Sequence, residues 1–527
     1  MTGAGLLIQG GAIADGGGGP PVPADVLVYG ERIAAVATPG TIPPGDRRLL
    51  DATGLIVAPG FIDVHSHADN APLLASDDTT KILQGVTTEV VGNCGMSLAP
   101  LDLTSADSRN HVGRFFPGVD PTWQSWSRFV EYADDLGYVT NHAALLGHGT
   151  LRAAVLGLAD AAPDAEQLAT MGRLLDEAFE GGAFGLSSGL IYPPGRFSDT
   201  AELIELARHL GPSRIYATHL RDEADLLLAS IAEAARIGAE SGCPVHLSHL
   251  KRAGMANWHT MPSALSAIAH ATDTGVSITK DVYPYTASST MVTALLPPPF
   301  LIGDDETVLA RLASPDQRRR LALLVEGGYP GWENPGRAAG WDGVLLSATG
   351  SHRYEGHTLA ELAEQLGTTP VDALVRILLE EKLNAQMVLF DMHPDDLRAA
   401  LADPDTMIGS DGLPPGTGGK PHPRLLGTFP RVLGHYVNDT LPLGEAIRRM
   451  TSLPARVFRI PERGWLRPGY LADLVAFDPR TIDHRCDYRD PVQPVSGISW
   501  VSQAGRLVVD HNRYLGPRLG RRLTPAG

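Results

Sequence analysis

Short apolar runs that alternate with turn residues mark both ends of the chain. LLIQGGAIAD, DVLVYGERIAAVAT and RLLDATGLIVAPG lie near the N-terminus, and GWLRPGYLADLVAFDP and ISWVSQAGRLVVDHNRYL near the C-terminus. Apolar runs bounded by Gly, Pro and Asp are typical of β-strands. Because two strand-rich ends flank a different middle, we predict one small β-sandwich built from residues 1–58 and 460–516.

The middle of the chain alternates short apolar strands with helical patterns. Eight candidate strands occur in series: GFIDVHSH, TTEVVGNC, HAALLGHG, AFGLSSGL, RIYATHL, PVHLSHLK, VSITKDVYPY and TMIGSDG. Helical patterns such as AEQLATMGRLLDEAFEGG and DLLLASIAEAARIGAESG lie between them, and the second ends at Gly242, a typical residue after a helix. This α/β pattern predicts a (β/α)8 barrel of the TIM type over residues 59–459.

This middle segment is longer than a barrel requires, since such a barrel needs about 250 residues. The largest interval lies between DVYPYTASST and IGSDG. It contains the proline-rich stretch LLPPPFLIGDD and the helical pattern DQRRRLALLVEGG. We therefore expect an inserted subdomain, over approximately residues 291–380, before the last strand.

Composition and charge narrow the class of protein. Hydrophobic residues make up 43% and charged residues 20%, as in globular proteins. A net charge of −17 without a Lys/Arg run argues against a nucleic-acid or anionic membrane partner, and no apolar stretch of about 18 residues is present. No signal peptide is predicted, and the three cysteines cannot form a disulfide framework, so we expect a cytoplasmic protein. The sequence leaves an oligomer open.

Side chains that can bind metal gather at the ends of the candidate strands. Barrel enzymes place their active sites at the C-terminal ends of the strands. Each residue alone could be a buried structural one, but the set supplies the N, S and O ligands that zinc prefers. Strands one, two, five, six and eight carry, in this order, His65 with His67, Cys94, His219, His249 and Asp411.

Other polar residues of these strands fit a structural role better. His246 precedes His249 by three residues, so it faces the opposite side of its strand. Cys243 and Cys486 fit no ligand pattern. His148 could point into the barrel mouth, but the sequence offers it no partner.

An ordered set of motifs resembles the D-aminoacylase group (N-acyl-D-amino-acid deacylases) of the amidohydrolase superfamily. The motifs include APGFIDVHSHAD, GVTTEVVGNCG, FGLSSGLIYPPG, THLRDE, HLSHLK, DVYPYTASST, IGSDG and PHPRLLGTFPR. They follow one another from about residue 50 to about residue 480, and although each is modest, the ordered set is specific.

The resemblance implies zinc-dependent hydrolysis of N-acyl-D-amino acids to a carboxylate and a free D-amino acid. It implies that Cys94, His219 and His249 hold a tightly bound Zn²⁺, with the Cys replacing the usual bridging carboxylate. His65 and His67 would form a second, often weakly occupied position, and Asp411 would act as general acid and base. The implied substrate contacts are Arg424, Tyr283 and Ser289 as a carboxylate clamp, with Lys251 and Tyr192.

The side-chain preference is inferred from a departure within the resemblance. Family members acting on acidic D-amino acids tend to place a basic residue just before the LPP segment, where this chain has TALLPP. An apolar wall would leave a substrate carboxylate unpaired, which is costly. We therefore expect a preference for hydrophobic D-residues. Other departures, such as Ala68-Asp69 after the His pair, concern substrate fit rather than metal ligands.

Three alternatives remain. Hydrolases of cyclic amides use a carboxylated lysine near strand four, and AFGLSSGL has no lysine. A biosynthetic product with an N-acylated D-residue would use the same residues as a simple N-acyl-D-amino acid. A non-catalytic scaffold relative should have lost metal ligands, and this chain keeps each one that can be placed.

Overall fold

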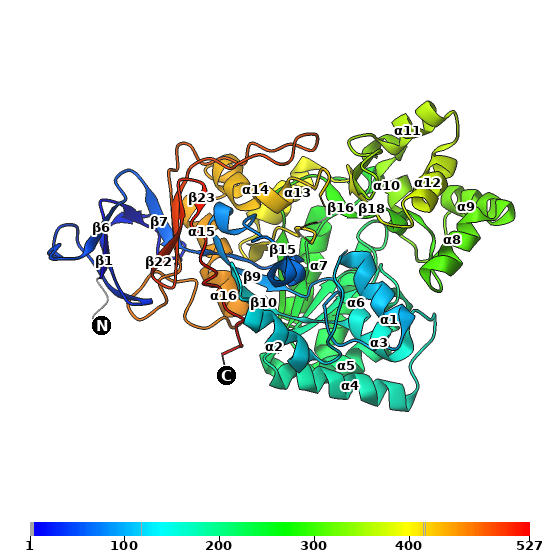
Figure 1. The fold of residues 1–527 in the computed structure, drawn as a ribbon, viewed down its shortest axis with the longest axis horizontal. Helices are drawn as coiled ribbons and strands as arrows, with labels where there is room; N and C mark the ends of the chain where they lie inside the picture. The colour runs from blue at the N-terminus through cyan, green and yellow to red at the C-terminus, as the bar shows by residue number, and fades with distance from the viewer. Residues whose placement is uncertain (1–4, 117, 415, 417, 527) are drawn as a thin grey trace.

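The computed structural model describes residues 5–116, 118–414, 416 and 418–526, and a parallel barrel lies at its centre (Figure 1). Neighbouring strands pair in parallel in chain order, and a parallel bridge between Ser66 and Gly412 joins the first strand region to the last. The strands are β8 (Phe61–Asp63), β9 (Val86–Val91), β10 (Asn141–Ala144) continued by β11 (Leu146–Gly147), β12 (Gly185–Gly189), β13 (Ile215–His219), β14 (Val245–Leu247), β15 (Ile278–Val282) and β19 (Thr406–Ile408). The predicted fold class is confirmed.

Helices surround this barrel. The two helical patterns singled out in the sequence form α4 and α6, and α6 ends at Gly242 with a φ of 78°, a left-handed conformation that glycine adopts without strain. The helices are α1 (Ala106–Phe115), α2 (Trp126–Leu136), α3 (His148–Leu156), α4 (Ala165–Glu180), α5 (Thr200–Ala207), α6 (Leu227–Ser241), α7 (Met261–Asp273), α13 (Pro394–Ala402), α14 (Arg424–Arg431), α15 (Leu443–Met450) and α16 (Ser452–Val457).

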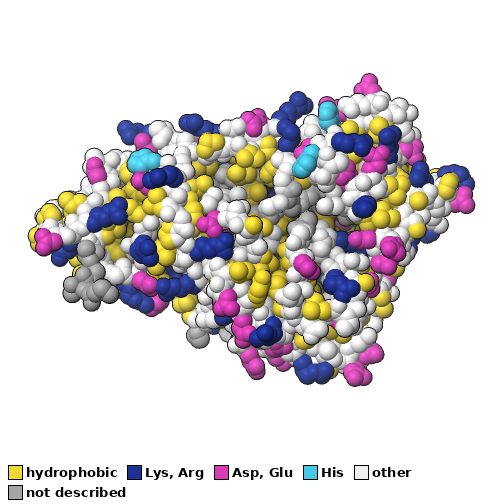
Figure 2. Space-filling view, in the orientation of Figure 1, with side chains coloured by type: hydrophobic (Ala, Val, Ile, Leu, Met, Phe, Trp, Pro, Cys, Tyr) yellow, Lys and Arg dark blue, Asp and Glu magenta, His cyan; other side chains and the backbone are white. Residues whose placement is uncertain are grey.

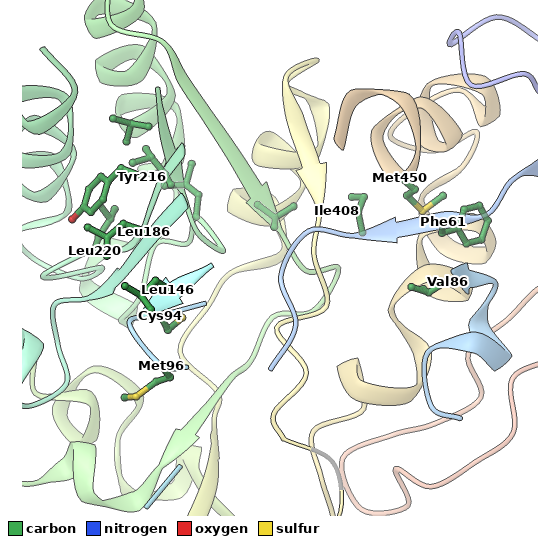
Figure 3. Packing of buried hydrophobic residues seen from close by; sticks show 14 of the residues in the cluster. Phe61, Val86, Cys94, Met96, Leu146, Leu186, Tyr216, Leu220, Ile408 and Met450 are labelled. Carbon is green, nitrogen blue, oxygen red and sulfur yellow. The ribbon is translucent and has the colours of Figure 1, made fainter. Parts of the chain in front are cut away.

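Buried apolar side chains fill the space inside and around the barrel. One cluster includes Ile62, Val90, Ala217 and Met407 from the strands. A larger cluster packs the helices onto the strands, and Figure 3 shows part of it, with Cys94 and Met96 near Leu146 of β11. The strand ends that carry the candidate ligands therefore rest on a packed core.

Two sheets at one end of the molecule draw on both ends of the chain (Figure 1, left). Their shared core includes Ile8, Val26, Leu474 and Trp500. The first sheet contains β1 (Leu6–Gln9), β4 (Asp25–Tyr29), β5 (Arg32–Ala37) and β6 (Arg48–Asp51). The second contains β2 (Ala12–Ile13), β3 (Val22–Pro23), β7 (Ile56–Pro59), β20 (Leu474–Phe477), β21 (Ile498–Gln503), β22 (Arg506–Asp510) and β23 (Arg513–Tyr514).

The chain continues beyond these sheets and returns to the barrel. Arg522 forms an ion pair with Asp134 of α2 at 2.9 Å. Leu523 is 6% exposed and packs in the same cluster as Ile62 and Val64. This return was not predicted, because residues 517–526 lack a distinctive apolar pattern.

An inserted unit lies between β15 and β19, at the upper right of Figure 1. It has its own apolar core, which includes Phe300, Leu321, Leu346 and Leu374. Its antiparallel sheet contains β16 (Ser288–Met291), β17 (Val344–Thr349) and β18 (Ala385–Leu389). Its helices are α8 (Asp305–Ala313), α9 (Pro315–Gly327), α10 (Pro335–Ala339), α11 (Leu359–Leu366) and α12 (Pro370–Glu380).

The surface drawn in Figure 2 intersperses acidic and basic side chains with apolar ones. Among the described residues, none of the helices combines the length and the apolar character needed to cross a bilayer.

Candidate metal centre and substrate cavity

The side chains selected from the sequence converge at the C-terminal mouth of the barrel. The Cys94 sulfur lies 3.3 Å from His65 Nε2 and 3.5 Å from His249 Nε2. It lies 3.7 Å from His219 Nδ1. These four residues lie at or just after the ends of four different strands, and all four are buried. Three imidazole nitrogens therefore lie within 3.7 Å of the Cys94 sulfur, although 184 positions separate the first and last of these residues in the chain.

Asp411 and His67 lie beside this group. His67 Nε2 is 3.2 Å from Asp411 Oδ1, and His65 Nε2 is 3.5 Å from the same oxygen. The backbone N–H of Asp411 donates to the carbonyl of His65 at 2.7 Å. The segments after the first and last strands are thus joined directly at the cluster.

Three of these residues have an unusual backbone. Cys94, His249 and Asp411 have φ values of 53°, 37° and 49°. The left-handed region is uncommon for residues other than glycine and costs free energy, which packing around the site must offset. Each of the three follows its strand by two or three residues, so the turn directs the side chain toward the cluster.

Buried carboxylates orient the imidazoles from behind. Glu223 lies 3.2 Å from His219 Nε2 and 3.1 Å from His249 Nδ1. Asp281 lies 3.6 Å from His65 Nδ1. One nitrogen of each ring therefore faces the cluster while the other faces a carboxylate, the arrangement that metal-binding histidines usually have.

Glu223 was missed by the sequence reasoning, although THLRDE places it four residues after His219. His246, predicted to face away from the cluster, lies 2.8 Å from Asp281 Oδ1 and 2.9 Å from Thr279. His148 also faces away and pairs with Glu202 at 2.8 Å.

The electrostatics of the cluster favour a thiolate. Burial alone would raise the pKa of the Cys94 thiol, but His65 and His249 hold that pKa well below its usual range. Burial would likewise lower the pKa of His219, but Glu223 and Cys94 raise it to about 9. A thiolate, imidazole nitrogens and a carboxylate in one buried place form a donor set that fits a zinc ion.

A cavity opens over the cluster. Its empty volume, which extends to the solvent, is about 540 Å³. Eight residues predicted for the site line it: His67, Cys94, Tyr192, His219, His249, Lys251, Ser289 and Asp411. The other three, His65, Tyr283 and Arg424, are at most 2% exposed and lie behind this wall in contact with it.

Arg424 is the first residue of α14 and has two protein partners. Its Nη2 lies 2.9 Å from Asp411 Oδ2 and donates to the carbonyl of Ser289 at 3.0 Å. Its guanidinium stacks 4.6 Å from the centre of the Tyr283 ring. Within the described part of the chain, its buried Nε and Nη1 have no hydrogen-bond partner. Two guanidinium nitrogens thus remain beside the cluster for a further acceptor.

The remaining predicted substrate residues are held by protein contacts. Lys251 Nζ lies 2.5 Å from Glu223 Oε2. The Tyr192 hydroxyl is 2.9 Å from Thr290 Oγ1. The Ser289 hydroxyl, on β16, donates to the carbonyl of Met387 on the neighbouring strand β18 at 2.8 Å.

Two further acids line the cavity, and the sequence reasoning did not select them. Burial raises the pKa of Asp391 to about 7, even though Lys251 acts in the opposite direction. Burial, with help from Glu223, raises the pKa of Glu333 to about 8. Neither acid offers a positive charge to an incoming anion.

An apolar cavity adjoins the first and shares Phe115, Ile191 and Tyr192 with it. Its wall also includes Met96, Met291, Ala294 and Leu301, together with His111 and Arg114. The Arg114 guanidinium is already paired with Asp305. Residues of the inserted unit thus form part of both cavities.

A parallel barrel with a buried Cys–His–Asp cluster at its C-terminal mouth defines a candidate metal-dependent hydrolase. Comparison with known proteins makes the assignment specific. The chain matches the amidohydrolase family over residues 48–496. It is 37% identical over 530 residues to a D-aminoacylase of Alcaligenes xylosoxydans xylosoxydans. The alignment covers 98% of this chain and 96% of that protein.

Two further relatives show the same relationship. An N-acyl-D-glutamate deacylase of Alcaligenes xylosoxydans xylosoxydans is 36% identical over 507 residues, covering 95% of this chain and 93% of that protein. The chain also matches a crystal structure of an N-acyl-D-glutamate deacylase of Bordetella bronchiseptica, which is complexed with zinc and a phosphonate mimic of the tetrahedral intermediate. The TM-score is 0.82 and the sequence identity 35%, and the match covers 98% of this chain and 99% of that one. The chain belongs to the amidohydrolase family, and the predicted resemblance to D-aminoacylases is confirmed.

Proposed function

We propose that this protein is a zinc-dependent deacylase that hydrolyses N-acyl-D-amino acids to a carboxylate and a free D-amino acid. The observation that carries the proposal is the convergence of Cys94, His219 and His249 beside an Asp411–Arg424 pair. That arrangement places a metal-binding group, a proton-transfer group and a carboxylate-binding group at one cavity.

Cys94, His219 and His249 would hold the tightly bound metal, and His65 with His67 a second, weaker position. Zinc, when bound, polarises the scissile carbonyl and lowers the pKa of water. The chain contributes a thiolate and imidazoles already oriented by Glu223 and Asp281.

Asp411 is suited to both proton transfers. Burial would raise its pKa, but Arg424, His249 and His65 hold that pKa well below its usual value. The carboxylate is therefore ionised and can take a proton from the attacking water. It can then return that proton to the departing amine.

Arg424 would bind the α-carboxylate of the substrate. Its Nε and Nη1 can each donate a charge-assisted hydrogen bond to an acceptor such as a carboxylate. The Tyr283 ring stacks against the guanidinium. Lys251, Tyr192 and Ser289 would contact the remaining substrate atoms. With the carboxylate anchored, the scissile bond is held beside Asp411.

The substrate side chain is expected to be hydrophobic. The lysine and arginine at these walls, Lys251 and Arg114, are already paired with carboxylates, so they give little compensation for the carboxylate of a D-glutamate side chain. A comparison of kcat/KM for N-acetyl-D-leucine and N-acetyl-D-glutamate tests this, and faster hydrolysis of the glutamate derivative would refute the preference.

A substrate screen with metal analysis tests the function. We expect turnover of N-acetyl-D-leucine but not of its L-isomer, loss of activity on chelation and recovery with added zinc. Asp411→Ala should retain zinc and lose turnover. Hydrolysis of cyclic amides instead of linear ones would favour the alternative of a cyclic-amide hydrolase, and a protein that binds no zinc would favour a scaffold.

The setting proposed for this reaction is the cytoplasm, with a small molecule as partner and no nucleic acid. The three cysteines are free and buried, which accords with a reducing compartment. Fractionation of cells that express the protein, followed by activity measurement, tests the location.

A further inference from the structure

A second group of metal-binding side chains lies on the surface, outside the substrate cavity. His259 follows the short 3-10 helix η5 (Met255–Asn257), and His393 and Asp395 lie at the start of α13. One donor atom from each of the three lies within 4.8 Å of the others. We propose that His259, His393 and Asp395 form a separate binding site for a borderline divalent cation such as Zn²⁺.

The donor spacing suits a shared ion. Asp395 Oδ2 lies 3.6 Å from His259 Nδ1 and 3.7 Å from His393 Nδ1. His393 Nδ1 also accepts a hydrogen bond from the backbone N–H of Asp395 at 3.2 Å, and an ion bound to this nitrogen would replace that bond. Tetrahedral zinc with bonds of about 2.1 Å separates its ligand atoms by about 3.4 Å, so small side-chain movements suffice. His259 and Asp395 are 61% and 66% exposed, which leaves room for water to complete the coordination.

The surrounding backbone holds the three residues in place. The Asp396 carboxylate accepts hydrogen bonds from the backbone N–H groups of His259 at 2.7 Å and Met261 at 2.9 Å. This fixes His259 in a left-handed conformation with a φ of 65°. The rings of His259 and His393 already lie 4.1 Å apart, so little ordering is left for the ion to impose.

The local charge also permits a cation. The start of α13 carries a partial positive charge, but Asp395 and Asp396 bring two carboxylates to its first turn. Among the ion pairs of the described residues, Asp395 meets only the two histidines of the site.

A second surface group, formed by His435, Asp483 and His484, is less suitable. There Arg431 Nη1 lies 2.9 Å from His484 Nε2, so a fixed positive charge already contacts one donor. This group supplies a matched control.

The location gives the proposed site a connection to the substrate cavity. The Trp258 indole N–H donates to the carbonyl of Asp391 at 3.1 Å, and the N–H of Gly254 donates to the same oxygen at 2.8 Å. An ion held by His259 and His393 would therefore cross-link the segment after Lys251 to the segment after Asp391. Lys251 and Asp391, after which these segments begin, line the cavity.

Equilibrium dialysis of the zinc-loaded enzyme against added Zn²⁺ tests the proposal. The wild type should bind one more equivalent of zinc than the catalytic centre holds. His259→Asn keeps a residue that tolerates left-handed backbone, and His393→Asn keeps a helix cap. Each should weaken the additional binding roughly tenfold or more, whereas His435→Asn should leave it unchanged.

Tryptophan fluorescence locates the ion independently, because the Trp258 ring lies 5.1 Å from the His393 ring. Added Cu²⁺ should quench this emission in the wild type, and His393→Asn and Trp258→Phe should each remove that quenching component. Unchanged thermal midpoints of the variants without added metal verify their folding. Two results would overturn the proposal: no additional zinc bound by the wild type, or additional binding that survives both histidine substitutions.

Discussion

At the scale of single residues, the proposed role of Arg424 would link substrate binding to proton transfer. One of its terminal nitrogens holds Asp411, while Nε and Nη1 are free to bind a carboxylate. The same side chain therefore holds the pKa of the Asp411 carboxyl low and, in the proposed function, would also position the substrate.

Arg424→Lys separates these two roles. Lysine keeps a positive charge near Asp411 but loses the Nε and Nη1 donors of the guanidinium. We expect kcat/KM for N-acetyl-D-leucine to fall roughly 100-fold, since two charge-assisted hydrogen bonds are lost. The loss for N-acetyl-D-leucinamide, which has no carboxylate, should be much smaller. Equal losses for both compounds would argue against carboxylate binding by Arg424.

The buried His111 makes stability depend on pH. Burial, with a contribution from Arg114, lowers its pKa from 6.5 to about 3. Between these values the unfolded chain binds a proton that the folded chain does not. The free energy of unfolding is therefore fully retained above pH 6.5 and falls toward pH 3, by up to about 1.4 kcal/mol per pH unit. His111→Gln should flatten this slope in urea unfolding, and an unchanged slope would exclude His111 as its source.

At the scale of elements, a buried lysine joins the first and last strand regions beside the candidate metal centre. Lys81 Nζ lies 2.9 Å from Asp63 Oδ2, 2.8 Å from Ser410 Oγ and 3.4 Å from Glu89 Oε2. Asp63 in turn accepts from the backbone N–H groups of His65 at 3.1 Å and Ser410 at 2.8 Å. The network thereby positions the segments that carry the candidate ligands His65 and His67 and the candidate acid and base Asp411.

Lys81→Met should destabilise the protein by about 3–5 kcal/mol, because it leaves buried carboxylates without their cation. Arg128→Met is a suitable control, since Arg128 and Glu131 are 74% and 63% exposed. An exposed pair of this kind contributes about 1 kcal/mol or less. Denaturant unfolding measures both, and similar small effects would show that the network is not required for stability.

At the scale of the whole molecule, units far apart in the chain complete one another. The inserted unit supplies Ser289 and Asp391 to the cavity wall. The C-terminal segment returns to the barrel, where Leu523 joins the cluster that contains Ile62 and Met407. The barrel that holds the site therefore depends on segments outside its own eight strands.

Leu523→Ala measures the contribution of this returning segment. Truncating a buried Leu side chain should lower the free energy of unfolding by about 2–5 kcal/mol. Leu515, which is 40% exposed, provides the matched control. Leu515→Ala should change the free energy of unfolding by about 0.5 kcal/mol or less. If both substitutions cost equally little, the segment does not stabilise the barrel.

Local pattern was sufficient to predict the repeating elements. Periodic apolar residues identified the barrel strands and helices such as α6, and Gly242 marked a helix end because few other residues tolerate its φ of 78°. The return of Leu523 to the barrel was missed, because the sequence around it carries no repeating pattern. Its position depends on an apolar surface that exists only after the strands have assembled.

By itself, the sequence determined where the chain forms strands and helices, and it placed the candidate metal ligands at strand ends. These features depend on neighbouring residues along the backbone. Only the tertiary structure decided that Glu223 faces His219 and His249, that Arg424 pairs with Asp411 and that the inserted unit forms part of the cavity wall. Such contacts depend on burial and on how distant segments pack, which no local pattern encodes.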